Sequence, residues 1–200
     1  MNIFAVHEHP GVAARSLPDK LVIKMPTEAI QMLTPWAFHT HDFATWKPDG
    51  TQYSTKGYAN HPCSKWLYES DANVMWLLEH ALEMSQEYTR RYNKQHGINY
   101  ALEQVANLTR NWMPGISCDH TEFVQAMPAE FRVPGDPVTA YRNYIIGYKG
   151  YAEWRYSEKP DWWDETKHEP VRKKYLAERE EKRIERANAK HQKLSRGLQD

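Results

Sequence analysis

The sequence predicts a mainly α protein, a compact helical domain with a short hairpin or loop insertion and a charged C-terminal helix. Apolar residues recur at the 3.6-residue period of an α-helix. The clearest helical stretches run from Asp19 to near Pro35, from Asp71 to Gly97 and from Ile98 to Met113. From Glu165 to Asp200 the chain holds eleven Lys or Arg and seven Asp or Glu, which is typical of a solvent-exposed helix. We therefore expect a helical domain over residues 1–163 and a charged helical tail over residues 164–200.

Charge and cysteine content restrict the function classes. The 200 residues contain 26 Lys or Arg and 26 Asp or Glu, so no global charge favours a nucleic acid or a membrane. The basic surplus of the tail favours a polyanion or a partner protein, although a solvated helix without a partner explains it as well. Cys63 and Cys118 form no disulfide framework or zinc motif. Without a signal peptide or a bilayer-spanning run, we expect a soluble intracellular protein without a cofactor.

Short segments connect the main helices. Asn2 to Val6 is an apolar run that forms a strand or an extended lead-in, and Val12 to Leu17 can make one or two helical turns. Asp19 is the expected N-cap of the helix that follows. Pro26 lies inside that helix, so it either kinks the helix or opens a second one.

The region from Trp36 to Ala59 reads as the hairpin or structured loop. Lys47-Pro48-Asp49-Gly50 is a turn sequence, and alternating residues follow it. His39 and His41 stand at a spacing that can face one metal ion, with His61 as the third candidate. Because no other strong ligand is near, we predict no metal site.

The second half continues with helices. Pro62 to about Ser70 and a long helix capped by Asp71 come first. Residues 117–134 form an irregular loop long enough to carry function. Asp136 is a good N-cap for the next helix, and Asp161-Trp162-Trp163 ends the domain.

A polar stripe on the first long helix is the leading candidate site. Lys20, Lys24, Glu28 and Gln31 follow one another at steps of four and three. Two ammonium groups one turn apart repel, so one lysine is expected to have a lowered pKa, and Glu28 can pair with the other. This arrangement favours amine chemistry; a solvated face of an amphipathic helix is the alternative.

A series of short motifs resembles a known family. The motifs are Asn2-Ile3-Phe4, Asp19-Lys20, Lys24-Met25, Glu28, Gln31-Met32-Leu33, His61-Pro62 with Trp66, Glu87-Tyr88 with Arg91-Tyr92, Gln125-Ala126-Met127-Pro128 and Ala140-Tyr141-Arg142-Asn143-Tyr144. Together they are similar to small phage proteins labelled pyrimidine-dimer DNA glycosylases, after the all-helical phage endonuclease V type. The resemblance covers about residues 1–163 and leaves the tail outside.

The resemblance implies base excision through an amine that forms a Schiff base with deoxyribose, assisted by a carboxylate. In the phage endonuclease the amine is the α-amino group exposed when the initiator Met is removed. Here Asn2 is expected to hinder that removal, which leaves Lys24 or Lys20 as the better amine and Glu28 as the carboxylate. Relatives often carry His where this chain has Leu21, so any proton-transfer role of that His is missing.

The resemblance also suggests substrate contacts. Arg91 and Arg142 are expected to hold phosphates, although a cation near the end of a helix also has a structural explanation. Trp36, Trp66 or Tyr141 would stack on an extruded base, although helix aromatics are commonly core residues. His61 and Asn143 complete the predicted substrate-binding set.

Three functions follow as alternatives. The first is a DNA glycosylase and lyase in the cytoplasm of an infected bacterial host, acting on damaged or modified pyrimidines. The second is a phage pyrimidine-modification transferase or nucleotide hydrolase. The third is a non-catalytic protein that binds a host factor or nucleic acid through its charged tail.

Overall fold

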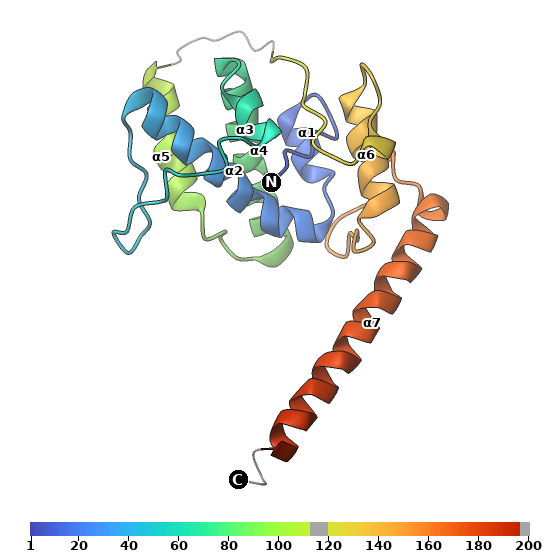
Figure 1. The fold of residues 1–200 in the computed structure, drawn as a ribbon. Coiled ribbons are helices and arrows are strands. Elements are labelled where there is room, and N and C mark those ends of the chain that lie inside the picture. The colour runs from blue at the N-terminus through green and yellow to red at the C-terminus, as the bar shows by residue number, and fades with distance from the viewer. Residues whose placement is uncertain (113–119, 197–200) are drawn as a thin grey trace.

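The computed structural model describes residues 1–112 and 120–196, and within them the chain is built from helices (Figure 1). The mainly α prediction is confirmed, since the described residues contain no strand. In chain order the elements are α1 (Pro10–Arg15), α2 (Asp19–His41), α3 (Pro62–Leu67), α4 (Asp71–Tyr92), α5 (Asn99–Trp112), the 3₁₀-helix η1 (Ala129–Phe131), α6 (Pro137–Tyr148) and α7 (Glu165–Arg196).

The core forms where α1, α2 and α5 pack against α4. Leu33 and Ala37 of α2 and Leu77 and Ala81 of α4 are fully or almost fully buried. The N-terminal segment also belongs to the core, because Ile3 to Val6 are at most 3 % exposed. The sequence left two conformations open for residues 2–6, a strand or an extended lead-in. The structure has the lead-in, which packs into the core.

Helix α2 is longer than predicted and runs through both of its prolines. We expected it to end near Pro35, yet it continues to His41; nor does a second helix begin at Pro26. The residues around the prolines, among them Met25, Met32 and Trp36, are buried. Each proline removes a backbone hydrogen bond and destabilises an exposed helix by about 3 kcal/mol. Burial of this apolar face offsets that loss of stability.

Two predicted N-caps are displaced by one residue, and one is confirmed. Pro18 precedes α2 as its N-cap, while Asp19 is the first helical residue. Ser70 caps α4 by accepting a hydrogen bond from the backbone N–H of Asn73, where Asp71 was expected. Asp136 caps α6 as predicted and accepts from the N–H of Thr139.

The insertion between α2 and α3 is a structured loop with one hairpin-like turn. A single antiparallel bridge joins Trp46 and Gln52, and Gly50 adopts a left-handed conformation in the turn between them. The side chain of Gln104 on α5 bonds both the N–H and the carbonyl of Trp46, at 3.0 and 2.8 Å. This pair anchors the loop to the helical core.

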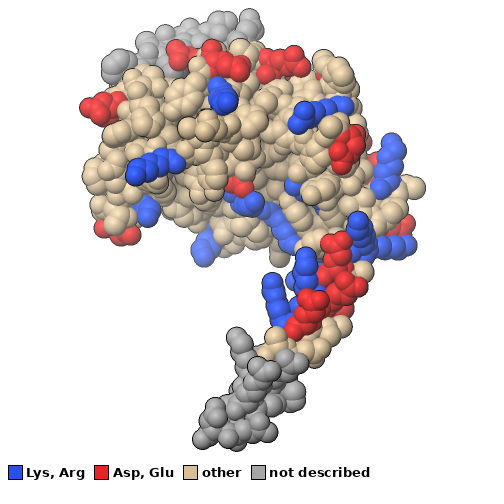
Figure 2. All heavy atoms as spheres, in the orientation of Figure 1, with Lys and Arg blue, Asp and Glu red and all other residues tan. Residues whose placement is uncertain are grey.

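Helix α7 begins at Glu165, at the start of the predicted tail, and leaves the body at an angle (Figure 1). Its first turns are packed: His168 is fully buried and its Nδ1 lies 2.8 Å from the carbonyl oxygen of Ile146 on α6. Farther along, charged residues of both signs cover the described part of the helix (Figure 2). Among the described residues, no helix combines the length and apolar composition that crossing a bilayer requires.

Candidate functional site

Glu28 on α2 lies between two amines. One of its carboxylate oxygens is 2.7 Å from the Nζ of Lys24, one turn earlier, and the other is 3.6 Å from the α-amino nitrogen of Met1. The Glu28 side chain is 12 % exposed, whereas the Lys24 side chain is 69 % exposed. The predicted pairing of Lys24 with Glu28 is therefore present, and the amino group of Met1 completes a small polar centre.

The N-terminal segment holds this amino group in place. The Met1 side chain is 2 % exposed, and the Asn2 amide donates a hydrogen bond of 2.8 Å to the carbonyl of Ala126. Asn2 Oδ1 in turn accepts the N–H of Phe4, which adopts an uncommon left-handed backbone conformation with φ of 42°. Such strained residues persist where the surrounding packing determines them, and they are frequent at functional sites.

Lys149, just past the end of α6, is a third amine near Glu28. Its Nζ donates a hydrogen bond of 2.9 Å to the Tyr144 hydroxyl and lies 4.3, 5.1 and 5.5 Å from the ring centroids of Tyr144, Tyr148 and Phe4. Burial lowers the pKa of Lys149, and the charge of Lys24 lowers it further, while Glu28 opposes the shift.

His61 borders the same centre from the start of α3. Its Nδ1 accepts the N–H of Cys63 at 3.2 Å, so a neutral ring carries its proton on Nε2. Burial lowers the pKa of His61, the Met1 amine lowers it further, and Glu28 acts in the opposite direction. Burial also raises the pKa of the Cys63 thiol to about 12, which excludes a thiolate nucleophile at neutral pH.

Lys20 does not belong to this centre. Its Nζ lies 3.0 Å from the hydroxyl of Tyr175 on α7 and about 5 Å from the rings of Tyr151 and Tyr175. Lys20 therefore connects the start of α2 to the C-terminal helix. The residues of the polar stripe therefore belong to two places. Lys20 contacts α7, whereas Lys24 and Glu28 lie near the N-terminus.

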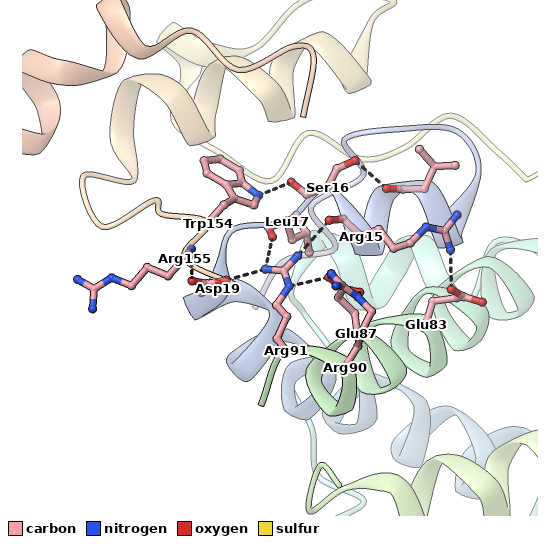
Figure 3. A network of polar contacts seen from close by, with 11 residues as sticks. Arg15, Ser16, Leu17, Asp19, Glu83, Glu87, Arg90, Arg91, Trp154 and Arg155 are labelled. Carbon is pink, nitrogen blue, oxygen red and sulfur yellow. Dashed lines mark hydrogen bonds and ion pairs between the residues drawn. The ribbon is translucent and has the colours of Figure 1, made fainter. Parts of the chain in front are cut away.

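Arg91, a predicted phosphate contact, lies in a buried network that gives it a structural role. Its side chain is fully buried, and its donors bind Glu87, Asp19 and the carbonyls of Leu17 and Arg15 at 2.6 to 3.0 Å (Figure 3). Asp19 also accepts the backbone N–H of Arg155. These bonds use four of the five guanidinium N–H groups, and they tie the turn between α1 and α2 to the end of α4.

The predicted stacking residues are buried as well. Trp36, Trp66 and Tyr141 are 3 %, 1 % and 0 % exposed, and Tyr141 donates a hydrogen bond of 2.7 Å to the carbonyl of Val124. The packing of these rings in the core gives all three a structural role.

The remaining two predicted substrate contacts lie on α6. Arg142 is half-buried, and its Nε donates to the carbonyl of Val6 at 2.9 Å, which fastens the N-terminal segment. Asn143 is exposed. Neither position tests its predicted contact with the substrate.

The histidines considered for a metal are dispersed. His39 hydrogen-bonds the carbonyl of Thr55 at 3.1 Å, and the ring of His41 packs against Trp36. In the described ranges, no three His, Cys, Asp or Glu side chains are grouped closely enough to hold a metal ion.

Lys149 is the site group that sequence reasoning missed, whereas the N-terminal amine was considered and set aside in favour of a lysine. The sequence holds one local sign of Lys149, since Tyr144 and Tyr148 are spaced to lie on one face of α6 directly before it. No local pattern connects that face to Glu28, because the connection depends on how α6 packs against the N-terminal segment.

Comparison with known proteins gives one match. A family model described as pyrimidine dimer DNA glycosylase matches residues 1–100, which is half of the chain and includes Met1, Lys24, Glu28 and His61. No curated protein and no solved structure matches the chain.

Proposed function

Because this chain belongs to the pyrimidine dimer DNA glycosylase family, whose substrate is DNA, we propose that it removes a damaged pyrimidine through an amine held against Glu28. The observation that carries the proposal is the contact of Glu28 with two amines, the α-amino group of Met1 and Lys24 Nζ. A primary amine beside a carboxylate is the minimum needed for Schiff-base chemistry at a sugar carbon.

The proposed reaction balances with these groups alone. Glu28 accepts a proton from the attacking ammonium group, and the neutral nitrogen bonds to C1′ of the deoxyribose. The bond from C1′ to the base breaks, and the base leaves with the electron pair and takes up the proton that Glu28 holds. The Glu28 carboxylate, ionised again, stabilises the positive charge on the attached nitrogen and the sugar. The nitrogen then passes its second proton to O4′, the sugar ring opens and the Schiff base forms. Loss of a C2′ proton and elimination of the 3′ phosphate cleave the strand.

The Met1 amine is the proposed nucleophile. Its side chain is buried and its segment is bonded to Ala126, so the nitrogen is held in one position, whereas the Lys24 side chain is 69 % exposed. α-Amino groups as a class also release their proton more readily than lysine side chains. Retention of Met1, which Asn2 favours, thus supplies the amine. Lys24 and Lys149 then provide positive charge for the phosphates beside the lesion.

Borohydride trapping tests the assignment. The protein is incubated with a duplex that contains one abasic site, reduced with borohydride, digested, and the modified peptide is identified by mass spectrometry. We expect the DNA remnant on the Met1 peptide, and loss of trapping when two residues are added before Met1. Lys24→Ala should retain the adduct. An adduct on Lys24 or Lys149 would contradict the choice of nucleophile.

Glu28→Gln tests the carboxylate. The amide keeps the shape of the side chain but accepts no proton, so cleavage of the glycosidic bond in a duplex with one thymine dimer, measured as the thymine set free when the dimer is photoreversed, should fall at least about 100-fold. Lys20→Ala is the matched control on the same helix and should release the base at the wild-type rate. Equal rates for the Glu28 and Lys20 variants would remove Glu28 from the mechanism.

The same assay separates the alternative activities. A glycosylase breaks the bond between C1′ and the base, so a free thymine appears when the dimer is photoreversed. A pyrimidine-modifying transferase leaves an altered nucleoside in the strand, so mass spectrometry of both fractions distinguishes the two. We propose that the activity is exerted in the cytoplasm of an infected bacterium. A host factor bound through α7 is the remaining proposal, tested by deletion of residues 180–200 in infected cells.

A further inference from the structure

A hollow of about 420 Å³ lies between α2, α3 and the loop that joins them. Gln31 and Pro35 of α2 form one side, Ser64 and Tyr68 the opposite side, and the loop around Gly57 the third. The volume is within the range of small-molecule sites. It is therefore large enough for a planar heterocycle.

The position of the hollow relative to Glu28 follows from helix geometry. Gln31 comes three residues after Glu28 on α2, and Ser64 comes three residues after His61 at the start of α3. Helices α2 and α3 pack against each other, and the charge of Glu28 acts on the pKa of His61. Residues three apart are neighbours about 5 to 6 Å apart on a helix face. Gln31 and Ser64, which both line the hollow, therefore lie three residues beyond Glu28 and His61.

The loop is pressed against α2 and forms a defined wall. A Cβ atom at Gly57 would lie 2.6 Å from both the Gln31 carbonyl oxygen and the Pro35 ring, so only glycine permits this approach. A hydrogen bond between His39 Nε2 and the carbonyl of Thr55 holds the same loop from the other end. The hollow is therefore bounded on three sides before any ligand enters.

Its chemistry suits a nucleobase. Ser64 is 5 % exposed, and its buried hydroxyl has no hydrogen-bond partner among the described residues. Such an unpaired group in a cavity wall needs an explanation. The Gln31 amide offers a donor and an acceptor side by side, which complements the ring N–H and carbonyl of thymine or uracil. Tyr58 and Tyr68, 63 % and 48 % exposed, supply aromatic faces at the rim.

We propose that this hollow receives the pyrimidine that is released, with Gln31 and Ser64 bonding its polar edge. The inference rests on the proposed function, because it takes C1′ of the damaged nucleotide to lie at Glu28. The attached base then extends about one helical turn farther, which is the level of Gln31 and Ser64.

Two DNA substrates test the base pocket, one with a thymine dimer and one with an abasic site. The abasic duplex has no base to recognise, so the variants Gln31→Ala and Ser64→Ala should cleave it within about twofold of wild type. On the dimer duplex each variant should lose on the order of tenfold in the single-turnover rate, as for loss of one hydrogen bond. Gln52→Ala, an exposed glutamine of the same loop, is the control and should behave as wild type on both.

The outcomes separate this inference from the proposed function. Wild-type rates of both variants on the dimer duplex, or equal losses on both substrates, would overturn the base pocket while leaving the amine chemistry intact. If the wild type neither cleaves nor traps abasic DNA, the proposed function fails. Saturation-transfer NMR with free thymidine then decides the pocket: a signal that the double variant loses supports it, and an equal signal in both proteins overturns it.

Discussion

The Nζ of Lys149 and the hydroxyl of Tyr144 are 2.9 Å apart, and this bond holds a lysine of lowered pKa among three aromatic rings beside the Glu28 centre. Burial is the main cause of the lowered pKa, because the rings remove water from the ammonium group. The charge at this position therefore disappears at a lower pH than at an ordinary lysine.

Lys149→Arg should change the pH dependence of DNA binding. In the wild type, affinity is expected to fall as the pH rises through the lowered pKa of Lys149, since the protonated form is the one that attracts phosphate. Arginine stays charged, so the variant should keep its affinity across the same range. Fluorescence anisotropy with a labelled duplex between about pH 7 and 10 measures this. Lys94→Arg at an exposed position is the control, and an identical profile for all three proteins would contradict the role.

Arg91→Ala should destabilise the protein by about 3 to 5 kcal/mol, because it leaves Glu87 buried with one partner fewer and removes the bonds to Asp19 and two carbonyls. Arg90→Ala provides the comparison, since Arg90 pairs with the same Glu87 but is 58 % exposed and should cost at most about 1 kcal/mol. Urea unfolding measures both. Similar losses for the two variants would show that the buried network does not stabilise the turn.

The unfolding free energy should fall in mild acid because of His80. Burial lowers its pKa from 6.5 to about 4, and Nδ1 lies 3.0 Å from the carbonyl of Pro10. Between these two values the unfolded chain binds a proton that the folded protein does not, so stability decreases as the pH falls, by about 3 kcal/mol in all. His80→Gln should remove this part of the slope. The exposed His39→Gln should retain it, and an unchanged slope in the His80 variant would reject the assignment.

Two truncations of α7 should behave differently. Deletion of residues 180–200 removes a charged part in which residues 180–189 are exposed, and should leave stability within about 1 kcal/mol of wild type. Deletion of residues 165–200 also removes His168 and the Tyr175 that packs on Gly150, and should cost at least about 2 kcal/mol. Thermal denaturation and base release from dimer DNA measure both. Loss of base release after the shorter deletion would show that the tail takes part in catalysis or DNA binding.

The sequence predicted the helices well, but not all of their ends. Helix α2 continues past Pro35, and Ser70 caps α4 in place of Asp71, because the packing of Trp36 and the hydrogen bond to Asn73 are not visible in local propensity. The pairing of Lys24 with Glu28 was predictable, since residues one turn apart meet whatever surrounds them.

The aromatic and arginine assignments depended on burial that no single segment reveals. Trp66, Tyr141 and Arg91 have side chains suited to DNA, yet each is surrounded by residues from distant parts of the chain. A motif shared with a family does not say whether a residue faces the substrate or the core.

By itself the sequence determined the helical class, the family resemblance and the acid–amine pair on α2, because these depend on the spacing of residues along one helix or on short motifs. The tertiary structure decided that the Met1 amine, His61 and Lys149 join that pair and that Lys20 does not. The physical reason is burial. The N-terminal segment, α3 and the end of α6 meet at Glu28 because the apolar residues beside the polar groups pack into one core.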